Sequence, residues 1–383
     1  MNKKSIFKLG IDASRYNVNE PTGVEWYSYH LLNDLIPVLG RDHNMEVTLY
    51  TQKPNPYVVE LPFNVKEKVI ATPRLWTMVR LSLEMLFRPI DALFIPSHIL
   101  PLWLPKKTIV TIHDIAFKMP GMEKVYDWKN SVLLKWSTWR AVKKAYRIIV
   151  PSESVKEDLI KVYNCNPEKI RVVYHGGPDM TGENNPLFRK WSEGQKTQIL
   201  NRLGLSDKDL IILFVGRLEK KKNLANLVAG FARFLKEYPD WKLVLAGKKG
   251  LGHEEIIAKI TELGLGKSVV MTGYISEDEK KFLLEKCRVF AFPSKYEGFG
   301  LPILEAFANR RPVLTSKVSS MPEIAGKAAF LVDPDKVEEI GVGLKRLVAD
   351  GVYISKLISE GEKQLAKFSW EKAARETFNV LTE

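Results

Sequence analysis

The fold is constrained most by an alternation of short β-type runs with helical patterns, which occurs twice along the 383 residues. Strands that alternate with helices predict parallel sheets covered on both faces. The first half has helical patterns that start at Thr22–Gly23 and span Leu75–Phe87 and Trp128–Ala145, and β-type runs at Ile6–Asp12, Val47–Tyr50, Lys68–Ala71, Asp91–Ile95, Thr108–Ile112, Arg147–Val150 and Ile170–Val173.

A segment crowded with glycine, proline and asparagine, from His175 to about Lys196, interrupts this alternation. Such a composition marks a domain boundary. The alternation then restarts with β-type runs at Leu210–Val215, Lys242–Ala246, Ser268–Thr272, Arg288–Phe292, Pro312–Thr315 and Ala328–Val332, between which lie helical patterns. We therefore expect two doubly wound α/β domains, at 1–175 and 197–368, with a linker at 176–196. Ligands of open parallel sheets bind at the carboxyl ends of the strands, so a site is expected in a cleft between the domains.

Composition and charge narrow the class of protein. Only Cys165 and Cys287 are present, which excludes a disulfide framework and favours a reduced, cytoplasmic protein. No apolar run approaches the ~18 residues that span a bilayer. The net charge of +13 is compatible with nucleic acid, an anionic membrane surface or phosphate-bearing substrates, and charge alone does not choose among them.

The most informative stretch runs from Phe292 to Ala306. The β-type run Arg288–Phe292 enters a turn with two glycines, and Pro302 then opens a helical pattern at Ile303–Asn309. A strand, a glycine turn and a helix N-terminus together predict an anion site, because backbone N–H groups and the positive helix end point the same way. Glu297 and Glu305 flank this turn and are suited to hydroxyl groups. A ligand with a diphosphate for the anion site and sugar hydroxyls for the carboxylates is a nucleotide-sugar.

A second basic turn, Gly216–Asn223, follows the β-type run that ends at Val215. Arg217 can bridge two phosphate oxygens and a lysine adds a mobile charge, although an ordinary solvated basic turn explains the same residues. Because Lys220, Lys221 and Lys222 are consecutive, the phosphate-binding lysine is either of the last two.

Three other positions have both a functional and a structural interpretation. His113 ends a predicted strand on the expected cleft side, whereas a lone histidine is more often structural, and the adjacent Asp114 is either a catalytic acid or a turn cap. Gly23 allows close backbone approach to a ligand or simply makes a tight turn. The triplet Asp333–Asp335 precedes a helical pattern, so we expect helix capping there and assign no metal site.

The stretch Gly121–Arg147 combines basic residues with aromatic ones. It contains Tyr126, Trp128, Trp136 and Trp139 among Lys124, Lys129, Lys135, Arg140, Lys143, Lys144 and Arg147. One interpretation is a surface that presses onto an anionic bilayer. The other is a helix with a buried aromatic stripe and a solvated basic face.

Together these segments resemble the retaining glycosyltransferases of the family-four group, which have the GT-B fold of two Rossmann-like domains facing a central cleft. The most specific match is the E-x7-E signature, Glu297–Glu305. Further matches are Gly23, His113, Val215–Leu218 with Lys222, Gly273–Tyr274, Ser319–Ala325 and Phe368–Glu371. The resemblance also implies that the last helix, 369–383, returns to the first domain.

The resemblance implies a role for each matched residue. Arg217 and Lys222 would hold the donor diphosphate and stabilise the leaving nucleotide, Glu305 would bind the ribose hydroxyls, and Glu297 would position the donor sugar without acting as a nucleophile. His113 would contact the sugar or the acceptor. The other donor-binding positions would be Gly23, Gly216, Tyr274, Gly298, Phe299, Gly300 and Leu301.

The expected activity is therefore metal-independent, retaining transfer of a hexose from a nucleotide-sugar, without a resident cofactor. Arg74–Arg80, Pro96–His98 and Thr111–Phe117 look like the mannosyl- and rhamnosyl-transferring branch, which favours GDP-mannose over a UDP-sugar. The expected acceptor is a glycan, a lipid-linked glycan or a polysaccharide precursor, which would bring the protein to the inner face of the cell membrane. A nucleotide-sugar epimerase and a basic nucleic-acid-binding protein remain the alternatives.

Overall fold

The computed structural model describes residues 6–16, 23–54, 60–71, 76–122, 128–178 and 191–383. They form two compact units. Unit 1 consists of Met1–Met119, Asp127–Gly176 and Phe368–Glu383, and unit 2 of Pro120–Tyr126 and Gly177–Lys367. Pro21, Thr22, Arg74, Lys124, Tyr126 and most of the predicted linker lie outside the described residues.

Unit 1 contains a seven-stranded parallel sheet with the order β3-β2-β1-β4-β5-β6-β7. Its strands are β1 (Phe7–Asp12), β2 (Met45–Thr51), β3 (Val65–Val69), β4 (Ala92–Ile95), β5 (Lys107–Thr111), β6 (Arg147–Val150) and β7 (Ile170–Val172). Its helices are α1 (Gly23–Gly40), α2 (Leu81–Phe87), which continues a π-helical turn at Trp76–Arg80, α3 (Trp128–Lys144), α4 (Glu153–Tyr163) and α13 (Trp370–Thr382).

Unit 2 contains a six-stranded parallel sheet with the order β10-β9-β8-β11-β12-β13. Its strands are β8 (Leu210–Val215), β9 (Trp241–Ala246), β10 (Val269–Gly273), β11 (Val289–Phe292), β12 (Val313–Ser316) and β13 (Ala329–Val332). Its helices are α5 (Glu193–Leu203), α6 (Leu224–Leu235), α7 (His253–Glu262), α8 (Glu277–Lys286), α9 (Leu301–Ala308), α10 (Met321–Ala325), α11 (Val337–Ala349) and α12 (Gly351–Leu365).

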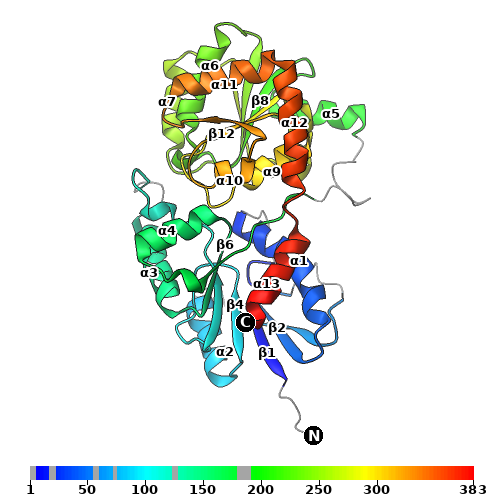
Figure 1. Cartoon of the computed structure of the whole chain (residues 1–383). Helices are drawn as coiled ribbons and strands as arrows, with labels where there is room; N and C mark the ends of the chain where they lie inside the picture. The colour runs from blue at the N-terminus through cyan, green and yellow to red at the C-terminus, as the bar shows by residue number, and fades with distance from the viewer. Residues whose placement is uncertain (1–5, 17–22, 55–59, 72–75, 123–127, 179–190) are drawn as a thin grey trace. The chain divides into compact units, whose positions relative to one another are not determined.

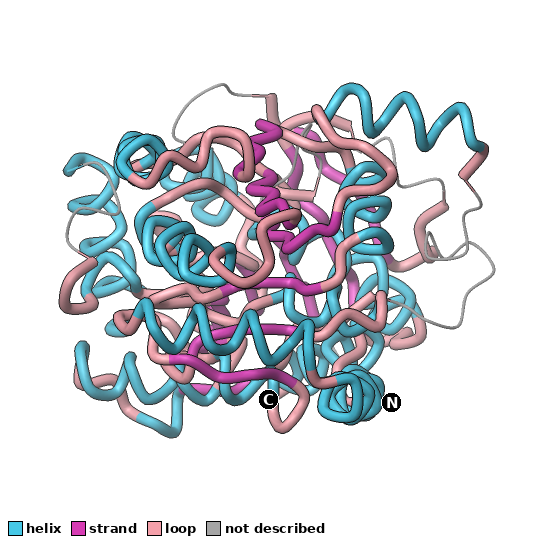
Figure 2. The backbone as a smooth tube through the Cα atoms, turned by 90° about the horizontal axis from the view of Figure 1, so that it is seen from above, coloured by secondary structure: helices cyan, strands magenta, loops and turns pink. Residues whose placement is uncertain are grey.

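The final helix belongs to unit 1, where α13 lies beside α1 (Figure 1). Ala373, Ala374 and Leu381 of α13 join the core that α1 and β1 build. At the end of the chain, the carboxylate of Glu383 accepts hydrogen bonds from Arg147 at 2.6 Å and from Arg171 at 2.8 Å. In each unit helices alternate along the chain with the strands of a parallel sheet, as the sequence pattern predicts; Figure 2 draws the strands in magenta and the helices in cyan.

Two local predictions were wrong. The strand predicted at Lys68–Ala71 lies at Val65–Val69, at the edge of the sheet. Its Lys66 and Glu67 contact Glu46 and Thr51 of the neighbouring strand. Charged residues are common on edge strands, and here they hide the apolar alternation in the sequence. The predicted linker 176–196 contains the start of α5, which Ser192 and Gln195 cap reciprocally.

Within the described residues, no helix combines the length and the apolar character needed to cross a membrane.

Three histidines lie in unit 1 just past strand carboxyl ends: His98 after β4, His113 after β5 and His175 after β7. The Tyr27 ring lies 4.6 Å from the rings of both His113 and His175. Burial lowers the pKa of His98 to about 4, and it also lowers the pKa values of His113 and His175. All three imidazoles are therefore neutral at pH 7.

This arrangement predicts a loss of stability at mildly acidic pH. A histidine that is neutral when folded takes up a proton on unfolding, so its contribution is present above pH 6.5 and is lost as the pH falls toward the folded pKa. For His98, this amounts to about 2 kcal/mol between pH 7 and pH 5. We expect His98→Gln to reduce the fall in the free energy of unfolding, measured in urea at both pH values.

The wild type and His98→Gln must be compared because the contribution of Asp12 to stability changes with pH in the opposite direction. Burial raises the pKa of its carboxyl, so the folded state gains protons there as the pH falls. Equal pH dependence in the wild type and His98→Gln would contradict the assignment of a neutral, half-buried His98.

Candidate donor-binding site at the sheet edge of unit 2

The topology of unit 2 singles out one place at the carboxyl edge of its sheet. From β8 the chain runs outward through β9 to β10 and then returns to the other side of β8 as β11. The connections that leave β8 and β11 therefore diverge, and ligands of open α/β sheets bind at such a switch point. The segments that follow these strands are Gly216–Asn223 and Pro293–Gly300, the two turns that the sequence singles out.

An ion pair joins the two turns. The Lys222 ammonium lies 2.6 Å from a carboxylate oxygen of Glu297, and their side chains are only 13% and 10% exposed. The same ammonium lies 5.1 Å from the centre of the Phe292 ring. Lys221 instead faces Glu219, with 3.9 Å between the charged atoms. Of the two lysines that the sequence left open, Lys222 is the one beside the signature carboxylate.

Hydrogen bonds to backbone carbonyls fix the shape of the turn at Pro293–Gly300, which we call the signature turn. The Ser319 hydroxyl donates to the Glu297 carbonyl at 2.6 Å, and the Ser320 hydroxyl lies 2.8 Å from the Phe299 carbonyl. The Lys295 N–H donates to the Lys221 carbonyl at 2.8 Å, which ties this turn to the one after β8. Ser319 and Ser320 belong to the stretch Ser319–Ala325, which resembles the family but for which the sequence indicates no role.

Helix α9 begins directly after this turn. Gly300 precedes it with φ of 108°, a left-handed conformation that favours glycine, and Pro302 lies in its first turn. Gly300 has no side chain to cap the helix, Pro302 has no N–H, and the Ile303 N–H donates to the Gly300 carbonyl at 2.9 Å, which leaves the Leu301 N–H of the first turn available to another acceptor. Gly298 and Phe299 are buried in the turn, and Leu301 is half-buried. This is the geometry expected of an anion site.

Glu305 of α9 has a cationic partner that the sequence did not reveal. The Lys280 ammonium of α8 lies 2.8 Å from Glu305 and 2.7 Å from Glu277. Burial opposes the charge of Lys280, but the two carboxylates outweigh it and raise its pKa. Lys280 therefore stays protonated and holds one oxygen of Glu305. Its position on a charged helix, 25 residues before Glu305, gives no pattern that would have identified it.

Close backbone packing shapes the turn that carries Arg217. Gly216 and Gly247 follow the adjacent strands β8 and β9 with φ of 150° and 148°. A Cβ at Gly247 would lie 1.9 Å from the Gly216 carbonyl oxygen, so only glycine fits there. The exposed guanidinium of Arg217 has no hydrogen bond or ion pair to another described residue. It is thus a cation at the switch point without a protein counter-charge in this part of the chain.

Tyr274 follows β10 at the same edge and is 46% exposed. The Lys248 ammonium, from the turn after β9, lies 4.7 Å from the centre of the Tyr274 ring. Lys248 is a further basic residue at this edge, and it follows a predicted strand and a glycine in the same way as Arg217.

The remaining predicted site residues belong to unit 1. The His113 Nε2 lies 2.9 Å from the Pro96 carbonyl oxygen. Asp114 acts as a turn cap, since its carboxylate accepts a hydrogen bond from the Ala116 N–H at 3.1 Å. Gly23 begins α1, and a Cβ built there meets no atom of the described chain within 4 Å. Packing therefore gives no reason for glycine at this position. The approach of His113 and Gly23 to unit 2 stays a prediction.

The capping role expected of Asp333–Asp335 was wrong. The residue that precedes α11 is Lys336, and no side chain caps the helix. Asp333 instead accepts a hydrogen bond from the Asp335 N–H at 3.1 Å, and Asp335 lies 2.5 Å from the Lys295 ammonium. The pair shapes the loop after β13 and holds Lys295.

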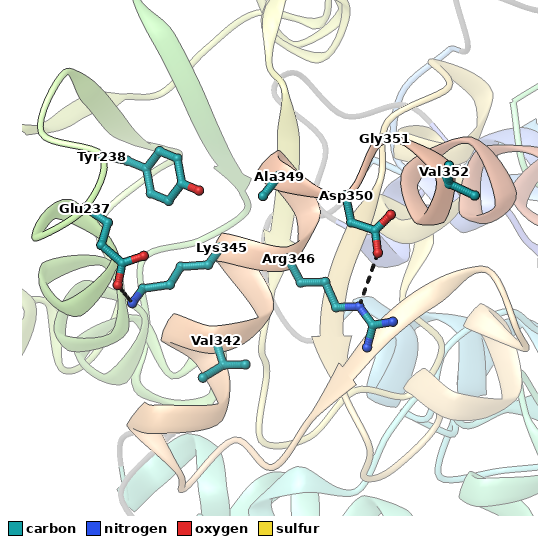
Figure 3. Close-up of a pocket in the computed structure, with 9 residues that line it drawn as sticks. All are labelled: Glu237, Tyr238, Val342, Lys345, Arg346, Ala349, Asp350, Gly351 and Val352. Carbon is teal, nitrogen blue, oxygen red and sulfur yellow. Dashed lines mark hydrogen bonds and ion pairs between the residues drawn. The ribbon is translucent and has the colours of Figure 1, made fainter.

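A hollow on unit 2 lies away from the switch point that carries the two turns (Figure 3). It is lined by Glu237, Tyr238, Val342, Lys345, Arg346, Ala349, Asp350, Gly351 and Val352. These residues come from the segment after α6, from α11 and from the start of α12. The carboxyl ends of α6 and α11 lie at the amino edge of the sheet because each helix runs back against its strand. Its lysine and arginine already face Glu237 and Asp350.

Family models match both halves of the chain. Residues 21–177 match the model described as Glycosyltransferase Family 4, and residues 195–364 match the one described as Glycosyl transferases group 1. The second range contains both turns of the candidate site.

Curated relatives agree with these models. The chain is 30% identical over 237 residues to an uncharacterised glycosyltransferase of Methanocaldococcus jannaschii. The aligned region covers 61% of this chain and 59% of the relative. It is 27% identical to the O-antigen chain mannosyltransferase B of Escherichia coli, over 74% of this chain and 72% of the relative. A Campylobacter jejuni enzyme named N-acetylgalactosamine-N,N'-diacetylbacillosaminyl-diphospho-undecaprenol 4-alpha-N-acetylgalactosaminyltransferase is 32% identical over 66% of this chain and 64% of its own length.

Solved structures share the fold along nearly the whole chain. Sucrose-phosphate synthase of Thermosynechococcus elongatus superposes with a TM-score of 0.71 at 18% identity, covering 98% of both chains. HepE of Anabaena, in complex with UDP and glucose, has a TM-score of 0.69 at 17% identity and covers 99% of this chain and 100% of its own. The chain therefore belongs to the glycosyltransferases, with a family-four amino-terminal half, a group-1 carboxyl-terminal half and the GT-B fold.

Proposed function

We propose that this protein transfers a hexose from a nucleotide-sugar to a glycan or lipid-linked acceptor during the assembly of a polysaccharide. The observation that carries the proposal is the group of side chains at the switch point of unit 2. Arg217, Lys222 and the start of α9 supply positive charge there, beside two carboxylates, Glu297 and Glu305, that are each held by a lysine.

The positive groups match the chemistry of the leaving group. Breaking the bond between sugar and phosphate leaves a nucleoside diphosphate with additional negative charge. Arg217 and Lys222 can stabilise this charge, and the start of α9 adds the Leu301 N–H and the helix dipole. We propose that these groups suffice without a divalent metal, so transfer should persist in EDTA.

The two carboxylates have different partners and therefore different proposed roles. Lys280 holds one oxygen of Glu305, which leaves the other to accept hydrogen bonds from ribose hydroxyls. Glu297 lies with Lys222 at the diphosphate end, where it would position the donor sugar. We propose transfer with retention by attack on the same face of the sugar, so that Glu297 is not a nucleophile, in contrast to the paired acids of retaining hydrolases.

The proposed donor is GDP-mannose. Its support is the similarity to the O-antigen chain mannosyltransferase B of Escherichia coli and the sequence matches around Pro96–His98 and Thr111–Phe117. A UDP-sugar is the competing donor, since HepE was solved with UDP. The proposed acceptor is lipid-linked, in view of the similarity to the Campylobacter jejuni enzyme whose name includes diphospho-undecaprenol. The corresponding location is the inner face of the cell membrane.

A thermal-shift panel of GDP-, UDP- and dTDP-sugars tests the donor. A ligand present at 100 times its Kd stabilises the native state by about 2.7 kcal/mol. We expect GDP-mannose to raise the melting temperature more than the other donors do. A larger shift with a UDP- or dTDP-sugar would overturn the choice of donor, and conversion of the donor sugar without any acceptor would favour an epimerase over a transferase.

The role of Lys222 predicts a selective loss of activity. Lys222→Ala should lower kcat/KM by about 100-fold or more, because it removes a charge that is stronger toward the transition state than toward the ground state. Lys220→Ala is the matched control, since this neighbouring ammonium lies 3.2 Å from Glu255 at the surface. It should change kcat/KM by no more than about twofold. Equal effects of the two substitutions would contradict the assignment.

The contact of Lys280 with Glu305 predicts a change in ribose recognition. Lys280→Gln should raise the donor KM by about tenfold with a much smaller change in kcat, because Glu305 loses the group that orients it. Lys280→Arg should restore part of the affinity. Glu277→Gln is the control, as it removes only the other partner of Lys280.

Deoxyribose donors separate this role from a general structural one. The wild type should bind donors with a 2′- or 3′-deoxyribose more weakly than the ribose donor by calorimetry, and Lys280→Gln should lose this discrimination. Unchanged discrimination in the variant would show that Lys280 does not act through Glu305.

A further inference from the structure

Helix α3 of unit 1 has its most apolar residues on its outer side. Trp128, Val132, Trp136 and Trp139 are 72%, 59%, 39% and 51% exposed, and their spacing places them along one stripe. The buried side of the helix carries Ser131, Ser137, Thr138, Ala141 and Val142. Of the two interpretations of this stretch, the one with a buried aromatic stripe is therefore wrong. Three exposed tryptophans opposite a buried side of mainly small and hydroxyl-bearing residues reverse the usual arrangement of a surface helix.

The exposed apolar area extends beyond α3. Leu102 and Trp103, in the loop after β4, are 54% and 58% exposed, and Val79, Leu83, Leu86 and Phe87 follow one face of the turn at Trp76–Arg80 and of α2. Among the described residues, eleven of the 21 exposed large apolar side chains lie in these three segments. We call the segments 76–88, 100–107 and 128–144 the apolar-basic face.

Hydrogen bonds hold the three segments together. The Arg140 guanidinium of α3 donates to the Leu102 carbonyl at 2.7 Å and to the Leu100 carbonyl at 3.2 Å. The Ser82 hydroxyl accepts from the N–H groups of Leu102 and Trp103 at 2.6 and 3.3 Å. The loop that presents Trp103 is thus anchored to both helices. The exposed side chains form one preorganised surface, not separate protrusions.

The charges of this face are positive. Helix α3 has no acidic residue, and its last turn ends with the exposed Lys143 and Lys144. Lys106 is exposed in the loop. The sole carboxylate of the three segments is Glu84, which is buried and paired with Lys68 and Arg88. Tryptophan together with lysine, without exposed carboxylates, matches the interface of an anionic bilayer, where aromatic rings lie at headgroup level and each nearby lysine is attracted to lipid charge.

We propose that the apolar-basic face docks unit 1 onto an anionic lipid membrane. Apolar side chains of α2, the loop at Leu102–Trp103 and α3 would enter the interface, while Lys106, Lys143 and Lys144 contact the headgroups. This deepens the proposed function, because it brings the protein to the surface where a lipid-linked acceptor lies. The surface itself is independent of the donor site.

Vesicle sedimentation of the full chain, without donor or acceptor, tests the proposal. We expect binding to vesicles of phosphatidylcholine with phosphatidylglycerol that is about tenfold stronger than binding to phosphatidylcholine alone, and that weakens as salt is added. Trp128→Ser/Trp139→Ser should lower the partition by about tenfold. Lys143→Glu/Lys144→Glu should lower it by a similar factor for the anionic vesicles.

Matched controls come from exposed residues of unit 2. Val342 and Val352 are 59% and 86% exposed, and Val342→Ser/Val352→Ser removes apolar surface without touching the face. Lys236→Glu/Lys356→Glu makes the same change of net charge at two exposed lysines. Both controls should bind like the wild type. Circular dichroism and thermal melting establish that every variant is folded.

Three results would overturn the proposal. They are no sedimentation of the wild type at low salt, equal binding of the wild type and the tryptophan variant, and self-association of the wild type that is lost in that variant without any vesicle binding. The last result would identify a second copy of the chain as the partner. Equal binding to neutral and anionic vesicles would overturn the part played by lipid charge. Failure of sugar transfer to a soluble acceptor would count against the proposed function and leave the vesicle result unaffected.

Discussion

The ion pair between Lys222 and Glu297 is the interaction on which the candidate site depends. It joins the turn after β8 to the turn after β11, at the place where the chain leaves the centre of the sheet in opposite directions. Both side chains are nearly buried, so each charge needs the other, and loss of one partner leaves an uncompensated charge. The same pair holds an ammonium beside an uncapped helix start, where an anion can approach it.

The backbone around this pair explains why the site can be rigid without a ligand. Two serines fix the carbonyls of the signature turn, and a hydrogen bond from the Lys295 N–H to Lys221 ties it to the basic turn. Gly216 and Gly247 allow adjacent strand ends to approach so closely that no side chain fits between them. Rigid turns at strand ends position the charged groups before the substrate arrives, which is the arrangement that electrostatic catalysis requires.

Much of this could be predicted from the sequence because the informative residues lie close together along the chain. Glu297, Gly300 and Glu305 belong to one strand, turn and helix, and Arg217 directly follows a strand that is plainly apolar. The choice between Lys221 and Lys222 needed the structure, since the orientation of consecutive side chains in a short helical turn has no sequence signature. Lys280 was missed because its contact with Glu305 joins two different helices.

The orientation of α3 could not be predicted for a related reason. Its sequence fits either a buried or an exposed tryptophan stripe, and only packing against the sheet decides which side faces inward. Burial of Ser137 and Thr138 beside exposed Trp136 and Trp139 contradicts the pattern of an ordinary surface helix. Local departures from the usual rules are expected at functional or strained sites. Here the exposed tryptophans of α3 indicate an external partner for unit 1. The rest of the apolar pattern in unit 1 describes its core.

Hydrogen–deuterium exchange of the full chain, with and without a nucleoside diphosphate, measures directly whether the switch point of unit 2 is the donor site. If the switch point is the donor site, new protection will appear in peptides that cover residues 216–223 and 297–305, with no change around the hollow at residues 237–238 and 342–352. Protection at that hollow, with none in the two turns, would contradict this assignment.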